Sequence, residues 1–214
     1  MNHYVNATKI TLEEKRKRWD AVKGQVDNIT DKLGKPIDEE IKELIVGLNI
    51  FGFRTSMSCF GHIREKKNFD IKEYASTPYV FIEPEIDEEL EKKFEELRER
   101  VSIAKQTDIK EEIVKAHKAY EKFMEDAPLP NYLCIRKLIA LLTEFYKDRS
   151  VSYSVQLLVS GGHKAASIKN LGEGNRYFTD QATKKKMLKD YQNEFIAFGK
   201  FLNTRYLSEE PNIL

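Results

Sequence analysis

Four short segments with the composition of β-strands limit how this chain can fold. They are residues 53–58, which alternate weakly, residues 79–82, which are β-branched and aromatic, and residues 153–159 and 164–168, which flank a Gly-Gly turn. A helical pattern precedes and follows each pair, so both halves of the chain have the order helix, strand, strand, helix. We therefore predict an α/β (α+β) fold with one small, mostly antiparallel sheet covered by helices. The repeated order also suggests an internal duplication.

Helical periodicity accounts for most of the remaining chain. Thr11 and Glu14 have the spacing of a capping box, and apolar positions continue the first helix to Leu33. Asp38 is placed to cap a second helix, which Gly52 can end. The helices that we expect on either side of the central segment are residues 11–33, 38–51, 133–145 and 180–206.

Residues 86–126 form a separate helical segment between the two halves. Apolar residues recur at spacings of four and three, except for a five-residue step from Ala104 to Ile109. We expect one interrupted helix or a helical pair, as an excursion from a single domain that spans residues 1–214. An exposed apolar stripe on this excursion would make it a surface for a protein partner.

The composition excludes several classes of function. The 214 residues contain 36 basic and 35 acidic side chains, and a net charge of +1 does not support nucleic-acid binding. No apolar run approaches the ~20 residues of a membrane span. Two cysteines are too few for a disulfide framework, so we expect reduced thiols and a cytoplasmic location. The oligomeric state is not determined by these features.

Chemically active residues gather in the segment from Thr55 to His62, at the end of the first expected strand. Cys59 and His62 lie three positions apart, and an imidazole near a thiol is the usual arrangement for nucleophilic catalysis. We assign these two residues as candidate catalytic groups, and Thr55, Ser58 and Gly61 as candidate ligand-binding residues. The alternative is that Cys59 is simply buried, as free cysteines often are, and that His62 is a turn residue.

A second glycine–histidine pair follows the third expected strand. Gly162 and His163 occupy the same place in the second half that Gly61 and His62 occupy in the first. We therefore add Gly162 and His163 to the ligand-binding residues, since turn N–H groups can hold an anion. Cys59, His62 and His163 could also form a three-ligand metal site. No second Cys-x-x-Cys or Cys-x-x-His pair supports that alternative, His163 is distant in sequence, and no metal is assigned.

The segment also resembles known proteins. Four stretches are similar to a family of small uncharacterised bacterial proteins: Lys35-Pro-Ile-Asp38, Leu48-Asn-Ile-Phe-Gly-Phe53, Thr55-x-x-Ser-Cys-x-Gly-His62 and Pro78-Tyr-Val. More distantly, they resemble the wybutosine-synthesis tRNA methyltransferases, whose motif is Thr-x-x-Ser-Cys-Ser-Gly-Arg. The resemblance implies S-adenosylmethionine as a cofactor, but His62 stands where that family has arginine, which differs in charge and hydrogen-bonding geometry.

These observations lead to one expected function and two alternatives. We expect a small anionic or nucleotide-like ligand at the Cys59–His62 loop, with a methyltransferase-like reaction as the enzymatic form. The first alternative is ligand binding without catalysis. The second is a helical interaction protein that uses residues 86–126.

Overall fold

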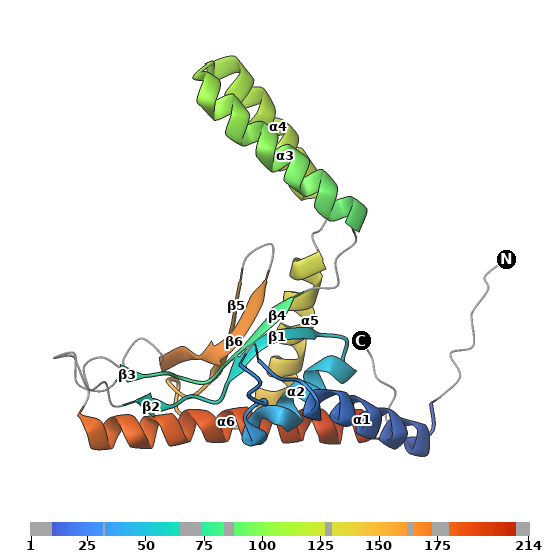
Figure 1. Ribbon diagram of the computed structural model, residues 1–214, viewed down its shortest axis with the longest axis vertical. Coiled ribbons are helices and arrows are strands. Elements are labelled where there is room, and N and C mark those ends of the chain that lie inside the picture. The colour runs from blue at the N-terminus through green and yellow to red at the C-terminus, as the bar shows by residue number, and fades with distance from the viewer. Residues whose placement is uncertain are drawn as a thin grey trace.

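A computed structural model describes residues 10–31, 33–64, 74–83, 88–126, 130–161, 165–172 and 180–208. It confirms the α+β fold (Figure 1). The helices are α1 (Leu12–Asp27), α2 (Lys42–Ile50), α3 (Glu88–Thr107), α4 (Lys110–Asp126), α5 (Pro130–Tyr146) and α6 (Gln181–Leu207), with a short 3-10 turn η1 (Glu39–Ile41) before α2. The strands are β1 (Arg54–Cys59), β2 (Ile63–Arg64), β3 (Tyr74–Ala75), β4 (Tyr79–Glu83), β5 (Leu157–Gly161) and β6 (Ala166–Asn170).

Two hairpin-like pairs of strands form the main sheet. Its order is β1-β4-β6-β5, and every neighbouring pair is antiparallel. The first half of the chain contributes β1 and β4, and the second half contributes β5 and β6, in the duplicated arrangement that the sequence suggests. The two halves meet at β4 and β6. Because these central strands run in opposite directions, the Cys59–Tyr79 pair and the Gly161–Ala166 pair lie at opposite ends of the sheet.

The two faces of the sheet have different environments. The inner face packs on α2, α5 and α6, and its side chains are almost fully buried: Val80, Ile82, Leu157, Ala166 and Ile168. On the outer face, Met57 is 57% exposed and Leu158 is 37% exposed. Tyr79 and Phe81 are half-buried on this same outer face, because they alternate with Val80 and Ile82 along β4.

A β-bulge decides which residues of β1 reach the outer face. Thr55 pairs with Ile82, whereas Met57 pairs with Phe81, so the register shifts between Thr55 and Met57. The extra residue turns Thr55 toward the inner face and Met57 toward the outer face, since directly paired residues share a face. Cys59 pairs with Tyr79 and therefore also belongs to the outer face.

Helix α6 is the main support of the fold. Its buried side chains Phe195, Phe198 and Leu202 are fully enclosed in the core, which also contains residues of α1, α2 and α5. It approaches α2 closely at Gly199, where a Cβ atom would lie 2.9 Å from the backbone nitrogen of Leu44. No described helix is long and apolar enough to cross a membrane.

Helices α3 and α4 form an antiparallel hairpin that projects away from the sheet (Figure 1). The phase break expected after Ala104 is present, because α3 ends at Thr107 and α4 begins at Lys110. Phe94 and Tyr120 pack against each other, with ring centroids 5.8 Å apart. Among the described residues, none from 88–126 belongs to the main hydrophobic core.

Several boundaries differ from the sequence predictions. Helix α1 ends at Asp27 instead of Leu33, because Asn28 caps it and no element covers Ile29 (45% exposed) or Leu33 (81% exposed). Strand β5 begins at Leu157 instead of residue 153, because residues 153–155 form a turn. The polar composition of residues 63–77 favours a loop, but β2 and β3 pair within them.

Candidate functional site

The candidate site is built around the turn that leaves β1. Gly61 has φ +85°, and a Cβ atom there would lie 2.8 Å from the Ser76 carbonyl oxygen and 3.0 Å from Pro78 Cδ. Both the backbone angle and the crowding require glycine at this position. The Gly61 N–H donates to Cys59 Sγ at 3.3 Å, so the turn points a backbone donor at the thiol.

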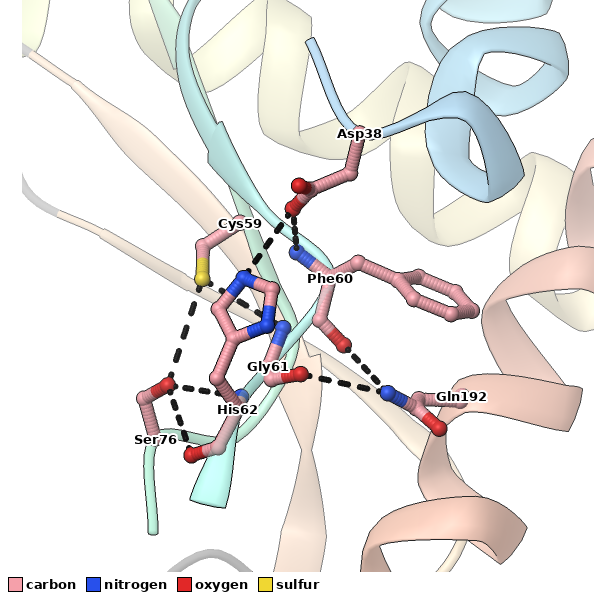
Figure 2. A network of polar contacts seen from close by, with 7 residues as sticks. All are labelled: Asp38, Cys59, Phe60, Gly61, His62, Ser76 and Gln192. Carbon is pink, nitrogen blue, oxygen red and sulfur yellow. Dashed lines mark hydrogen bonds and ion pairs between the residues drawn. The ribbon is translucent and has the colours of Figure 1, made fainter. Parts of the chain in front are cut away.

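Asp38 brings a carboxylate to this turn from another part of the chain. Asp38 stands at the N-cap position of η1, but its side chain makes no capping hydrogen bond. Its Oδ2 instead accepts the Phe60 N–H at 2.9 Å and lies 3.4 Å from His62 Nε2 (Figure 2). The Asp38 and His62 side chains are 34% and 45% exposed, so solvent can reach both.

Two further residues hold the turn in place (Figure 2). The backbones of His62 and Ser76 exchange hydrogen bonds, and Ser76 Oγ also accepts the His62 N–H at 2.9 Å. The same hydroxyl lies 4.0 Å from Cys59 Sγ. From α6, Gln192 Nε2 donates to the carbonyl oxygens of Phe60 and Gly61, at 3.2 Å each. The fold therefore fixes the turn from both sides.

Three side chains with metal-ligating or catalytic chemistry meet at this turn. One ligand atom each from Asp38, Cys59 and His62 lies within 4.8 Å of the other two. A carboxylate, a thiol and an imidazole this close together can hold a metal ion or act together in acid–base and nucleophilic chemistry. The Cys59–His62 pair predicted from the sequence is thus joined by Asp38.

The structure separates Thr55 and Ser58 from this cluster. Thr55 Oγ1 accepts a hydrogen bond from Asn49 Nδ2 of α2 at 3.2 Å, so it links β1 to a helix on the inner face. Ser58 pairs with the fully buried Val80 and points to the same inner face. Of the candidate ligand-binding residues that are described, Gly61 alone is part of the turn.

Gly162 and His163 lie outside the described residues, but the neighbours of that turn are described. Gly161 pairs with Ala166, Ala166 with Ile82, and Ile82 with Thr55. Gly161 and Ala166 are therefore level with the Thr55 end of β1, about 13 Å along that strand from Cys59 at ~3.3 Å per residue. The predicted role of Gly162 and His163 in ligand binding therefore stays a prediction.

Comparison with known proteins adds no family to this description. A scan against protein-family models, a search of curated proteins and a search of solved structures found no match.

Sequence reasoning missed Asp38, Ser76 and Gln192 as members of the site. Asp38 precedes a helix and matches the pattern of a cap, which concealed its other role. Asp38 lies 22 residues before Phe60, and Gln192 lies 132 residues after Phe60. No local spacing in the sequence brings these residues to the Cys59 turn.

The two cysteines should differ in reactivity. Cys59 receives a backbone N–H and lies beside His62, whereas burial raises the pKa of the Cys134 thiol in α5. Because the thiolate is the reacting form, we expect Cys59 to be alkylated at least several-fold faster than Cys134. Iodoacetamide labelling followed by peptide mass spectrometry, in buffer with a chelator, measures both rates. Equal rates would mean that Cys59 only fills space.

Proposed function

We propose that this protein binds a small nucleotide-like ligand on the outer face of its sheet, next to Asp38, Cys59 and His62. The observation that carries the proposal is the row of side chains across the sheet. Tyr79 pairs with Cys59 on one neighbouring strand and with Lys169 on the other. Directly paired residues share a face, so a thiol, an aromatic ring and an amino group lie side by side.

The aromatic residues of β4 supply a surface for a flat ring. The rings of Tyr79 and Phe81 are in edge-to-face contact, with centroids 5.4 Å apart, and both are partly accessible. Stacking of a base on an aromatic side chain contributes about 1–3 kcal/mol. A ligand with such a ring would lie on β4 and extend its substituents toward the Cys59 turn.

The charge of the cluster limits which ligands fit. Asp38 places a carboxylate where the sequence suggested an anionic ligand, and like charges repel. A bare phosphate at this turn is therefore disfavoured unless a cation lies between them. S-adenosylmethionine combines an adenine ring with a positively charged sulfonium, so the enzymatic form of the proposal is compatible with this charge. Support for that cofactor comes only from the resemblance of the Thr55–His62 motif.

A thermal-shift series tests the proposal. We expect millimolar S-adenosylmethionine or adenosine, neither of which brings a phosphate to Asp38, to raise the melting temperature, because a ligand that binds only the native state stabilises it. Tyr79→Leu and Phe81→Leu keep an apolar side chain but remove the ring, and each should weaken binding by about 5- to 150-fold, as the loss of 1–3 kcal/mol predicts.

Tyr153→Leu is the matched control, since Tyr153 is an aromatic residue 74% exposed outside the sheet. Its shift should equal that of the unmodified protein. Shifts retained in both β4 variants would place the ligand elsewhere, and no shift with either compound would reject a nucleotide-like ligand. Methyl transfer is measured separately. Binding of S-adenosylmethionine without methyl transfer would support the alternative of ligand binding without catalysis.

A helical interaction protein remains the second candidate. Three exposed apolar side chains lie near the turn that joins α3 to α4. They are Ile103, Ile109 and Val114, which are 54%, 50% and 44% exposed. Exposed apolar side chains that cluster on one surface often mark a contact with a partner. The outer face of the sheet ranks first because it adjoins a cluster of reactive side chains.

A further inference from the structure

We infer that Asp38, Cys59 and His62 form a binding site for one divalent metal ion of the zinc type, with a fourth position open to solvent or ligand. The three donors are a carboxylate oxygen, a thiolate sulfur and an imidazole nitrogen, which are the donor types that zinc takes in proteins. This site goes beyond the nucleotide proposal and stands without it, because it depends only on the turn and on Asp38.

The separation of the donors fits a metal better than a hydrogen bond. Asp38 Oδ2 and His62 Nε2 are 3.4 Å apart, whereas N–H···O hydrogen bonds are about 2.7–3.2 Å long. Two ligands at about 2.0–2.1 Å from zinc, at a tetrahedral angle, lie about 3.3–3.4 Å apart. In a tetrahedral zinc site the Cys59 sulfur would lie about 3.6 Å from each of the other two donors. The three donor atoms already lie within 4.8 Å of one another, so the sulfur needs to move by at most about 1.2 Å.

The direction of the imidazole also favours a metal over a catalytic triad. In a triad, one imidazole nitrogen faces the nucleophile and the other faces the carboxylate. Here a single His62 nitrogen lies within 4.8 Å of both the Cys59 sulfur and an Asp38 oxygen. Figure 2 shows the Nε2 edge of the ring turned toward Asp38, with the sulfur beside the ring. Convergence of both partners on one nitrogen is the arrangement that a metal ion requires.

The surrounding backbone holds the three ligands before any metal binds. Phe60 N–H donates to Asp38 Oδ2, Gly61 N–H donates to Cys59 Sγ, and Ser76 fixes the His62 backbone. Such outer contacts orient metal ligands, and losing one typically lowers affinity by about 10- to 100-fold. The partial exposure of Asp38 and His62 leaves room for a fourth ligand.

A bound cation would also change which ligands the site accepts. Its charge would offset Asp38 and could hold an anionic group of the ligand at the open position, next to Tyr79. This consequence rests on the proposed function, whereas the metal site itself does not.

Cobalt titration of the chelator-treated full chain tests the metal site, since cobalt(II) bound to a thiolate has a charge-transfer absorption band. We expect this band to saturate at one equivalent and to be reversed by zinc. Cys59→Ser should abolish it, and Cys134→Ser, the matched control in α5, should retain it. Persistence of the band in Cys59→Ser, or its loss in Cys134→Ser, would overturn the assignment.

Calorimetric zinc titration of two further variants tests the other ligands. Asp38→Asn keeps an oxygen to accept the Phe60 N–H, so it gives a result even if Cys59→Ser fails to fold. Asp38→Asn and His62→Gln should each weaken zinc binding by at least about 100-fold, more than the loss of an outer contact. His117→Gln, on α4, should leave it unchanged. Unchanged affinity in either site variant would overturn the three-ligand site. Because no organic ligand is present, these results are separate from the thermal-shift series.

Discussion

Replacing Arg149 with alanine should lower the free energy of unfolding by about 3 kcal/mol, the lower end of the cost of leaving one member of a buried ion pair alone, because Arg149 itself is 36% exposed. Arg149 donates from Nε and Nη2 to the two carboxylate oxygens of Glu194, at 3.1 and 2.6 Å. The Glu194 side chain is only 2% exposed, so the variant would bury an unpaired charge in α6. Chemical denaturation followed by circular dichroism measures the effect.

The control is Arg98→Ala in α3. Arg98 lies 3.9 Å from Glu95, and both side chains are about half exposed. Pairs of this kind contribute about 0–1 kcal/mol. If Arg149→Ala is too unstable to study, the double variant Arg149→Ala with Glu194→Leu should recover part of the stability, because it removes the stranded charge. Equal small effects in the two single variants would show that the Arg149–Glu194 pair does not hold α6 in place.

Replacing Gly61 with alanine should destabilise the protein by about 2–5 kcal/mol and remove the metal site. A left-handed backbone angle costs a non-glycine residue about 1–2 kcal/mol, and overpacking adds about 1–3 kcal/mol. The added Cβ would press on Ser76 and Pro78, on the segment that fixes His62. The turn would have to open, and Asp38, Cys59 and His62 would separate.

Gly52→Ala is the control, because it measures the cost of the left-handed backbone angle without the cost of crowding. Gly52 has φ +84°, almost the same as Gly61, but a Cβ atom there meets nothing within 4 Å. We expect this variant to lose about 1–2 kcal/mol and to bind zinc normally. Denaturation curves and zinc titrations of the two variants give the comparison. The same loss in both, with zinc binding retained, would mean that the Gly61 turn tolerates a side chain.

Local patterns predicted the elements of the fold well. The capping box at Thr11 and Glu14 is present, with Glu14 Oε2 2.8 Å from the Thr11 nitrogen. Apolar spacing identified α6 and the break between α3 and α4, because it reports which face of a helix is buried. Apolar spacing wrongly extended α1 through Ile29 to Leu33, since the presence of an apolar residue does not show whether another element will cover that residue.

The site was predicted only where it is continuous in sequence. Cys59 and His62 lie in one turn, so their spacing was sufficient to bring them together. The duplication suggested that His163 would join them, and His163 lies outside the described residues, so that prediction stays untested. Asp38 joins Cys59 and His62 by accepting a hydrogen bond from the Phe60 N–H. No periodicity in the sequence predicts this tertiary contact.

X-ray absorption spectroscopy of the zinc-loaded protein tests the central claim most directly, because it counts the ligands by element. A zinc ion held by Asp38, Cys59 and His62 should show one sulfur at about 2.3 Å and two or three nitrogen or oxygen ligands at about 2.0–2.2 Å. The sulfur contribution should vanish in Cys59→Ser and persist in Cys134→Ser. A spectrum of the unmodified protein with no sulfur ligand, or with two, would contradict a site made of Asp38, Cys59 and His62.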